Sequence, residues 1–494
     1  MPDSPTPVPL SSSTLGSLSP ALAIPRYDRH ALTAGIVHLG VGGFHRAHLA
    51  TYADELCAQG ETTWAITGAG VLPSDAHMAR VLHDQDHLYT LITRGPSEVD
   101  ARIIGSIIDY VHAVPDPQQL VDAIAAPTTS VVSLTVTEGG YPVDDLTGAF
   151  IATSANADDR SAFGLLVAGL DRRRRIGASG ITVLSCDNVI GNGRVARTAA
   201  LGVAERYDPR LAQWIEHEVT FPNSMVDRIT PATTDHDRSW LAAECGVLDR
   251  WPVATEPFRQ WVVEDAFASS RMPLERLDVL TTSDVEPYEV MKLRLLNAGH
   301  SCLAYLAALD GLETVDRALG AAHLRSFLEV FLTEEAQPVL PPITGISVDD
   351  YIDSLLERFS NPSIGDQISR LCLDGSSKFP KFLLPTVRAQ LVAGGPIRLS
   401  ALALAAWCVY LSGPRDGLAP DAHLDEAQRF ANASLDDPRQ FLAFTTVFGD
   451  DLAGADRFAG AFVDAVRHLR EQGVRSAIAA VLAEGSHLDG RPPR

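Results

Sequence analysis

Long apolar runs and paired cysteines are scarce in this chain of 494 residues. No window approaches about 18 uninterrupted apolar residues, so we expect no membrane-spanning helix. The first 25 residues contain no Lys or Arg and therefore lack the basic start of a secretory signal. The 6 cysteines stand far apart without a CxxC pair, which is typical of free thiols in a reducing compartment. We therefore expect a cytoplasmic protein that does not bind membranes.

Positive charge is also in the minority. The chain has 40 Lys and Arg against 62 Asp and Glu, which gives a formal net charge of −22. Nucleic acid is not expected as a partner, because phosphate binding needs a basic surface. The dense basic run from Arg172 to Arg175 falls in the expected last turn of a helix, where cations suit the carbonyl end of the dipole. We interpret this run as a solvated helix end.

Apolar patterning divides the chain into regions of different character. From residue 31 to 283, short apolar runs that suit strands alternate with helical stretches, which predicts an α/β domain with a mostly parallel sheet. From residue 284 to 494, strand-like runs are scarce, which predicts a predominantly α-helical C-terminal domain. Residues 1–30 are rich in Ser and Pro, and we interpret them as a flexible lead-in.

A glycine-rich turn follows the first strand of the α/β region. Its candidate cofactor contacts are Gly40, Val41, Gly42, Gly43, Phe44 and Arg46. Glycines at such a turn let backbone N–H groups approach a pyrophosphate, and a helix is expected to follow over Phe44–Gln59. The spacing departs from GxGxxG, because His45 takes the place of the third glycine. The turn therefore fits a dinucleotide site or packing alone.

The acidic residue that contacts the ribose of NAD usually stands about 20 residues further on. The second strand ends in Thr67–Gly70 without an acid, and Asp75 in the next loop is the nearest candidate. A carboxylate there favours NAD and repels the 2′-phosphate of NADP. A helix N-cap explains Asp75 equally well. We expect NAD rather than NADP, largely on Asp75.

Three histidines near the turn do not form a metal-binding pattern. His38, His45 and His48 lie across a strand end and a helix start. Their spacing does not resemble the HExxH arrangement, in which two His share one helical face. We therefore expect no metal.

The densest group of polar side chains lies in segment 286–300, which is expected to form one helix. Around the axis of such a helix, the side chains lie at roughly 0° for Lys292, 60° for Glu289, 80° for His300 and 140° for Asn297. All four therefore share one broad face. A Lys in a partly dry cleft becomes a usable general base, and an Asn donates to an oxygen with developing negative charge. A surface Lys with a capping Asn and an incidental His fits the spacing equally well.

Two further polar turns are candidates for ligand contacts. Ser185–Asn188 ends a strand, and ligands of open α/β sheets bind beyond the carboxyl ends of strands. Asn188 therefore either faces a ligand or forms an Asx turn that leads to Gly191. The second turn is Asp374–Lys381, preceded by Arg370. Its donors suit a ligand with many hydroxyls, although a solvated loop has the same composition.

Several segments together resemble the polyol-specific long-chain dehydrogenases and reductases. They are IVHLGVGGFHRAH from Ile36, SLTVTEGGY from Ser133, SCDN from Ser185, FPNSMVDRITP from Phe221, EPFRQWVVED from Glu256, YEVMKLRLLNAGHS from Tyr288, RFSNPSIGDQ from Arg358 and DGSSKFPKFLLPT from Asp374. The resemblance implies a Rossmann-type N-terminal domain, a helical C-terminal domain and a metal-independent site in the cleft between them. It also implies NAD as cofactor and a small polyol or ketose as substrate.

Roles for individual residues follow from the resemblance. Lys292 resembles the family's general base. The pair implied to hold the reacting oxygen is Asn188 and Asn297. His300, Arg370 and Lys378 are implied to contact substrate hydroxyls. Glu289 is implied to relay protons to solvent, and Asp227 to support the site. The expected reaction is oxidation of D-mannitol at C2 to D-fructose and the reverse reduction.

Other activities stay open at this point. Fructuronate reductase (D-mannonate oxidoreductase) and D-arabinitol dehydrogenase belong to the same family, and the segments FPNS and DGSSKFPK resemble the mannitol pattern more. Gly365 departs from the many relatives that carry a larger or basic residue there. A silent nucleotide-binding sensor is the candidate from another class, but such a protein is expected to lose Lys292 or the Asn pair. We expect a monomer or weak oligomer.

Overall fold

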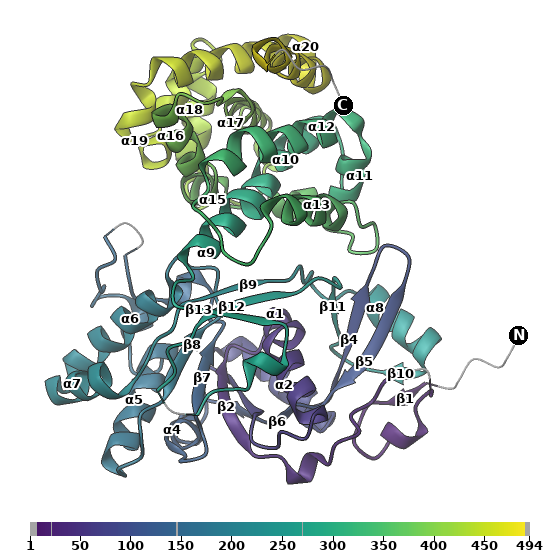
Figure 1. Ribbon diagram of the computed structural model, residues 1–494, viewed down its shortest axis with the longest axis vertical. Coiled ribbons are helices and arrows are strands. Elements are labelled where there is room, and N and C mark those ends of the chain that lie inside the picture. Colours follow the sequence, from purple (N-terminus) through teal and green to yellow (C-terminus); the bar gives the residue numbers. More distant parts are fainter. Residues whose placement is uncertain (1–6, 21, 145–146, 269, 490–494) are drawn as a thin grey trace, which may run out of the picture. The chain divides into compact units, whose positions relative to one another are not determined.

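The computed structural model describes residues 7–20, 22–144, 147–268 and 270–489. The chain forms two compact units, Met1–Glu286 and Pro287–Arg494. The first unit combines strands and helices, whereas the second consists of helices and their connections (Figure 1). This arrangement confirms the predicted fold class.

The first unit is built on a five-stranded sheet. Its strands, in spatial order, are β6 (Ile107–His112), β3 (Ala65–Gly70), β2 (Ala34–Leu39), β7 (Val131–Leu134) and β8 (Thr182–Ser185). All neighbouring pairs are parallel. The chain moves from β2 toward β3 and β6, and then returns to the other side of β2 with β7 and β8. The strand order therefore reverses between β2 and β7, the point at which open α/β sheets bind their ligands.

Helices cover the sheet on both faces. Those of the first unit are α1 (Gly43–Ala47), α2 (Leu49–Ala58), α3 (Ala76–Asp84), α4 (Gln118–Ala125), α5 (Ala162–Arg175), α6 (Asn192–Tyr207), α7 (Pro209–Glu218) and α8 (Asp235–Trp240). Side chains alternate along a strand, so Val37 and Leu39 join the core under α4 to α7, whereas Ile36 joins the core under α2 and α3. Burial on both faces explains why these strands are continuously apolar.

Smaller sheets border the main one. Their strands are β11 (Val253–Thr255), β4 (Tyr89–Arg94) and β5 (Val99–Ile104) in one sheet, β13 (Val279–Thr282), β12 (Gln260–Glu264) and β9 (Ser224–Asp227) in another, and β1 (Val8–Pro9) with β10 (Val247–Leu248). Each of the two three-stranded sheets contains one parallel and one antiparallel pair. Among the described sheets of three or more strands, only the five-stranded one is therefore parallel throughout.

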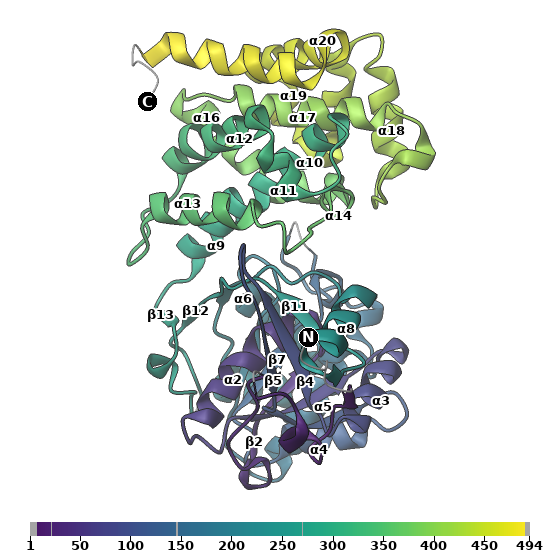
Figure 2. The same cartoon turned by 90° about the vertical axis from the view of Figure 1, so that its right-hand side faces the viewer.

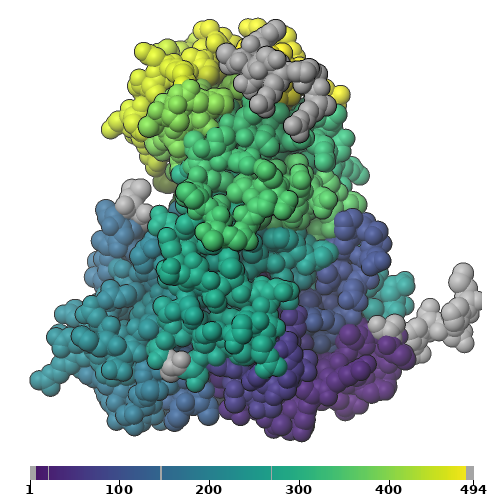
Figure 3. Space-filling view, in the orientation of Figure 1, coloured from purple at the N-terminus to yellow at the C-terminus, as the bar shows by residue number. Residues whose placement is uncertain are grey.

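The N-terminal segment packs against the first unit, so the predicted flexible lead-in over residues 1–30 is wrong for its described part, 7–20 and 22–30. Val8 pairs with Val247 in a parallel ladder. Leu10, Leu18 and Leu22 are buried in an apolar cluster that they share with residues of β4 and β5. Figure 3 shows this segment, in purple, as part of the surface of the unit. Isolated leucines in a Ser- and Pro-rich stretch have no periodicity, and only tertiary contacts reveal their burial. Residues 1–6 lie outside the described residues.

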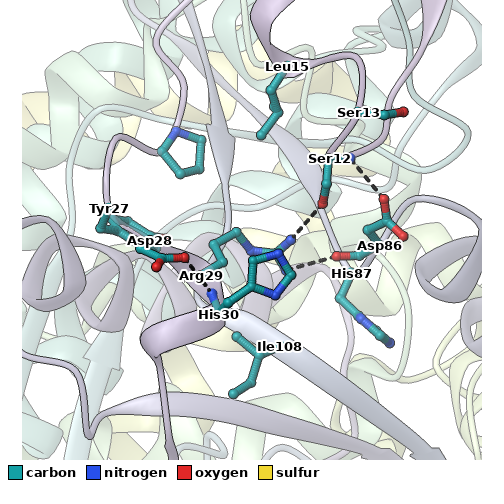
Figure 4. A pocket seen from close by; sticks show the side chains of 11 residues that line it. Ser12, Ser13, Leu15, Tyr27, Asp28, Arg29, His30, Asp86, His87 and Ile108 are labelled. Carbon is teal, nitrogen blue, oxygen red and sulfur yellow. Dashed lines mark hydrogen bonds between the residues drawn. The ribbon is translucent and has the colours of Figure 1, made fainter.

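Arg29 anchors the end of this segment (Figure 4). Its guanidinium donates to the carbonyl oxygens of Gly105 at 3.0 Å, Asp86 at 2.8 Å and Ile107 at 2.9 Å. It also donates to Ser12 Oγ at 3.2 Å, and the residues around it line a hollow of ≈ 570 Å³. One side chain therefore ties the N-terminal segment to the connection between β5 and β6.

The second unit is a stack of helices. They are α9 (Glu286–Lys292), α10 (Ala298–Leu309), α11 (Val315–Gly320), α12 (Ala322–Val330), α13 (Val348–Phe359), α14 (Ile368–Leu371), α15 (Gly375–Phe382), α16 (Leu384–Ala393), α17 (Arg398–Leu411), α18 (Leu424–Ala433), α19 (Thr445–Ala453) and α20 (Asp456–Asp489). Helix α17 is apolar around most of its circumference and packs between α10 and α20 (Figure 2), as expected of a central helix. Among the described residues, no helix has the length and apolar character that a bilayer crossing needs.

The basic run at the end of α5 is not fully solvated, which corrects its interpretation as a solvated helix end. Arg173 is 1% exposed. Its guanidinium donates to the carbonyl oxygens of Ser179 at 2.6 Å, Ala126 at 2.8 Å and Ile124 at 3.2 Å. Arg172, by contrast, is 49% exposed and pairs with Asp122. Arg173 thus ties the end of α4, through Ile124 and Ala126, to Ser179 in the segment that follows α5.

Replacing Arg173 by Lys is expected to destabilise the first unit. An ammonium group cannot reach all three carbonyls, and each buried acceptor left unpaired costs about 1–3 kcal/mol. We expect R173K to lower the free energy of unfolding by roughly 2 kcal/mol in urea titrations followed by tryptophan fluorescence. The matched control R172K is expected to change it by less than about 0.5 kcal/mol. Equal effects of the two substitutions would contradict this role.

Candidate active site

A pocket of ≈ 460 Å³ opens in the first unit at the carboxyl ends of β2, β7 and β8. The parallel register places Leu39 beside Leu134 and Leu134 beside Ser185, so the residues that follow these strands meet at one edge. The pocket is lined by Gly40, Gly42, Gly43, Phe44, His45, Thr135, Thr137, Glu138, Gly139, Cys186, Asp187 and Asn188. The structure therefore brings Asn188 together with four of the predicted cofactor contacts.

Glycine is required at the first position of the turn. Gly40 has φ +91°, and a Cβ there would lie 2.2 Å from the carbonyl oxygen of Thr135. At Gly42 the nearest atom to such a Cβ is 3.9 Å away, so the backbone there is open to a ligand. Val41 points into the core instead and is 8% exposed. The turn therefore combines close packing on one side with an accessible backbone on the other, as a pyrophosphate site needs.

Arg46 braces the turn and does not line the pocket. Its guanidinium donates to the carbonyl oxygens of Gly42, at 3.3 Å, and of Trp251. It also lies 5.3 Å from the ring centre of Tyr89, and burial lowers the pKa of Arg46. A direct contact between Arg46 and a cofactor stays a prediction.

Asp75 follows β3 by five residues and lies beside its last residue, Gly70, near the place where dinucleotide-binding domains carry their ribose-binding acid. Its Oδ2 atom would lie 3.0 Å from a Cβ at Gly70, the last residue of β3. The same atom accepts the backbone N–H of Leu72 at 2.9 Å. The carboxylate thus serves as a local cap, and its contact with a cofactor stays a prediction.

The helix predicted over Phe44–Gln59 is interrupted, which corrects that expectation. His48 has φ −116° and ψ −93° and separates α1 from α2. Its ring Nε2 donates to the carbonyl oxygen of Gln260 at 3.1 Å. His45 stacks on His38 with ring centres 3.4 Å apart. These are tertiary contacts, and local sequence patterns do not predict them.

The three histidines around the turn are buried and uncharged. Burial lowers the pKa of His38 and of His48 to about 3, and the pKa of His45 falls well below its usual value for the same reason. Across the described ranges, no three or more His, Cys, Asp or Glu side chains are grouped as metal ligands. The imidazoles therefore act as packing and hydrogen-bonding groups.

Asp187 is the buried carboxyl group of the pocket. It accepts hydrogen bonds from the backbone N–H groups of Val136 and Thr137, at 3.1 and 2.8 Å, and from the Tyr141 hydroxyl at 2.7 Å. Burial raises the pKa of Asp187 to about 6, and the nearby charge of Glu138 also raises it. At neutral pH the group is mostly ionised.

Asn188 follows Asp187 directly, and a second side chain fixes the backbone beside it. Asn192 donates from its side-chain amide to the carbonyl oxygens of Asp187, at 3.1 Å, and Ser224, at 2.7 Å. Ser224 begins β9, the strand that ends at Asp227, which is 3% exposed. The chain after Asn188 enters α6 through the left-handed Gly191, which has φ +62°, and the buried Asn192.

In the second unit, the segment predicted as one helix over 286–300 contains a π-helical turn. Residues Leu293–Asn297 form η8 between α9 and α10, and the N–H of Ala298 donates to the carbonyl of Leu293, five residues earlier. In such a turn, residues five apart lie about one turn apart. Lys292 and Asn297 are five apart, so they share a face more closely than a regular α-helix predicts.

The other polar side chains of this segment lie near the same turn. Glu289 and Lys292 are largely buried. The ring of His300 stacks on Phe359 with ring centres 4.0 Å apart. The Oδ1 atom of Asn297 is buried and accepts no hydrogen bond from the described residues. A buried, unsatisfied amide oxygen is costly, and a bound ligand offers it a partner.

Arg370 and Lys378 lie on neighbouring short helices of the second unit. Arg370 holds Asp366 through two hydrogen bonds of 2.7 and 2.5 Å, and its side chain is 51% exposed. Lys378 donates to the carbonyl oxygen of Leu371 at 3.1 Å. Gly365 has φ +63° with open space around a Cβ, so the backbone conformation favours glycine there. The substrate contacts expected of Arg370 and Lys378 stay predictions.

Several pocket residues were absent from the residues proposed from the sequence. They are His45, Thr135, Thr137, Glu138, Gly139, Cys186 and Asp187. All of them belong to the segments IVHLGVGGFHRAH, SLTVTEGGY and SCDN. The signal was therefore present in the polar ends of strands, and the pairing of β2, β7 and β8 was needed to show that these ends meet.

Comparison with known proteins places this architecture in a family. Residues 34–276 match the model of the mannitol dehydrogenase Rossmann domain, and residues 284–470 match the mannitol dehydrogenase C-terminal domain. The chain therefore belongs to the mannitol dehydrogenase family. This confirms the resemblance noted in the sequence and the prediction of an oxidoreductase of the polyol dehydrogenase type.

Individual relatives resemble the chain over most of its length. It is 44% identical to mannitol 2-dehydrogenase of Cereibacter sphaeroides, over 93% of this chain and 98% of the relative. It is 41% identical to mannitol 2-dehydrogenase of Phaeosphaeria nodorum, over 96% of this chain and 86% of the relative. The resemblance therefore covers both units.

Two solved structures are similar along nearly the whole chain. The mannitol 2-dehydrogenase of Pseudomonas fluorescens, in ternary complex with NAD and D-mannitol, has a TM-score of 0.88 and 38% identity and covers 97% of this chain and 100% of its own. A D-sorbitol dehydrogenase in substrate-free form has a TM-score of 0.86 and 36% identity, and the match covers 95% of this chain and 100% of the D-sorbitol dehydrogenase chain.

The buried histidines make stability sensitive to acid. Their folded-state pKa is lowered, so their contribution is fully present above the unfolded pKa of about 6.5 and is lost as pH falls toward 3. Each histidine is expected to remove about 1.4 kcal/mol per pH unit in that window. The variant H45F keeps an aromatic ring but cannot titrate. Between pH 7.5 and 5, H45F should lose about 2 kcal/mol less free energy of unfolding than the wild type, because about 1.5 pH units of that interval lie below the unfolded pKa.

Urea titrations at the two pH values measure this difference. The control H217Q changes an exposed histidine and is expected to leave the acid sensitivity of the wild type intact. If H45F and the wild type show the same pH dependence, His45 is not buried in its neutral form.

Proposed function

We propose that this chain is an NAD-dependent polyol dehydrogenase that oxidises D-mannitol at C2 to D-fructose and catalyses the reverse reduction. The main support is the combination of a glycine-turn pocket at the sheet's switch point with near full-length similarity to a mannitol 2-dehydrogenase that holds NAD and D-mannitol. Relatives named mannitol 2-dehydrogenase at 40–44% identity support the same substrate.

The residues of the pocket fit a dinucleotide. Gly42 offers an open backbone, Gly43 has only ordinary contacts around a Cβ, and Asp75 lies beside the last residue of β3. We assign the pyrophosphate to the Gly40–Phe44 turn and the adenosine ribose to Asp75, which disfavours the extra phosphate of NADP. When bound, NAD supplies the hydride acceptor for the carbinol carbon. The protein supplies binding, orientation and proton transfer.

Lys292 is proposed as the proton-transferring residue. In the oxidation direction its neutral amine takes the proton of the C2 hydroxyl, and in the reduction direction its ammonium returns a proton to the ketose oxygen. Glu289 lies three residues earlier, on the same face of α9, and is proposed to pass this proton to solvent. We therefore assign the proton transfer to Lys292 and not to a metal-bound water.

Amide donors are proposed to stabilise the reacting oxygen. Asn188 and Asn297 would donate to it while it carries alkoxide character, and such preorganised donors each contribute about 2.7–4 kcal/mol in comparable sites. The sugar's remaining hydroxyls are assigned to His300, Arg370 and Lys378. Asp227 is assigned a supporting role from β9.

D-sorbitol is a second candidate substrate. The D-sorbitol dehydrogenase structure matches this chain almost as well as the mannitol 2-dehydrogenase does. D-sorbitol differs from D-mannitol only in the configuration at C2, so a site built for one polyol presents most of the same donors to the other.

A matrix of substrates and cofactors tests the proposed function. Absorbance of the reduced nicotinamide is followed with D-mannitol, D-sorbitol and D-arabinitol in the oxidation direction, and with D-fructose, D-fructuronate and D-xylulose in the reduction direction. We expect the highest kcat/KM with D-mannitol and D-fructose, and at least tenfold preference for NAD over NADP. A higher kcat/KM with D-fructuronate than with D-fructose would overturn the assignment of D-mannitol and D-fructose as substrates. NADH binding without turnover of any sugar would favour a sensor.

Removing the amine of Lys292 is expected to separate catalysis from cofactor binding. General acid–base catalysis contributes about 10²–10⁴-fold, so K292A should lower kcat by at least about 100-fold. The dissociation constant for NADH, measured by fluorescence, should change less than about twofold, because the turn that binds it lies in the first unit. K381A is the matched control, because Lys292, Lys378 and Lys381 are the three lysines of the chain. Unchanged turnover in K292A would refute the assignment.

A further inference from the structure

Thr137 has a backbone conformation that normally requires glycine. Its φ is +64° and its ψ is 164°. This region is essentially restricted to Gly, and a β-branched side chain makes it less favourable still. Strained residues persist only where surrounding contacts hold them, and they cluster at functional sites. Thr137 lies just after β7 and lines the pocket.

Asp187 holds this strained backbone from the neighbouring strand. One carboxylate oxygen accepts the N–H of Thr137 at 2.8 Å, and the other accepts the N–H of Val136 at 3.1 Å. Tyr141 donates to Asp187 at 2.7 Å and is also bonded to Ser185 Oγ at 2.7 Å. Asp187 is 8% exposed, so little water competes for these bonds. Two successive N–H groups are therefore fixed by a single side chain.

The segment so fixed forms one wall of the pocket. Thr135, Thr137, Glu138 and Gly139 line it together with the glycine turn. Thr135 Oγ1 donates to the carbonyl oxygen of Gly40 at 2.7 Å, which ties the wall to the turn. If Thr137 relaxed to an ordinary conformation, the N–H groups at this wall would reorient and the distance across the pocket would change.

We propose that Asp187 is a positioning residue that keeps Thr137 in its strained conformation and thereby shapes the wall of the dinucleotide pocket. The proposal rests on the proposed function, because it takes NAD(H) as the ligand of this pocket. Asp187 acts through the backbone of its neighbours and takes no part in the chemistry. The strain at Thr137 is the reason why a charged group is retained at a buried position.

A double-mutant cycle tests this coupling. D187N replaces one acceptor oxygen by an NH₂ group that cannot accept from Val136 or Thr137, and T137G removes the strain, because glycine adopts this conformation without cost. We expect D187N to raise the dissociation constant for NADH at least tenfold when Thr137 is present. In the T137G background, D187N should raise it less than threefold. Rescue of this kind is not expected from a general loss of stability.

The matched control is D249N. Asp249 is also a buried carboxyl group that accepts backbone N–H groups, those of Thr90 at 2.5 Å and Trp251 at 2.8 Å, but it does not line the pocket. D249N is expected to lower the melting temperature and to change the NADH dissociation constant less than twofold in both backgrounds. If D187N does not fold, Y141F removes one bond to Asp187 and should give a smaller weakening that T137G again relieves.

The outcomes are distinguishable. Equal weakening by D187N in the two backgrounds would overturn the proposal, as would no weakening in either. Failure of the wild type to bind NADH would instead overturn the proposed function. Melting curves of each variant show whether the first unit is folded in the samples used for binding.

Discussion

The parallel pairing of β2, β7 and β8 is the constraint on which the site of the first unit depends. This register brings the ends of three strands that are distant in sequence to one edge. The Gly40 turn, the Thr137 wall and Asn188 each follow one of these strands. A shift in register would separate them, so the core that fixes the sheet also fixes the pocket.

Buried polar side chains reinforce these strand ends. The Thr135 hydroxyl donates a hydrogen bond to the carbonyl oxygen of Gly40. Its oxygen therefore accepts a hydrogen bond from His38 Nε2 at 2.9 Å. Neutral His38 must then accept from Ser133 Oγ through Nδ1, at 2.8 Å. Asp187 makes a second set of bonds on the other side of β7. Because burial makes an unpaired polar group costly, these bonds hold the pocket in one geometry.

The sequence allowed the architecture and much of the candidate site to be predicted. The change from strand-like to helical patterning separated the two regions, and the polar ends of strands identified Gly40 and Asn188. Tertiary features were missed, because no local pattern encodes them. His48 breaks a helix to reach a distant carbonyl, and Arg173 turns inward from a basic run. The π-turn that aligns Lys292 with Asn297 likewise has no periodic signature.

The most direct test of the account is chemical rescue of K292A by small primary amines. If Lys292 transfers the proton, mannitol oxidation by K292A with NAD should rise with amine concentration. It should also rise with the basicity of the neutral amine, while NADH binding stays constant. Residual activity that does not respond to amines, in a variant that binds NADH normally, would contradict the assignment of Lys292 as the base.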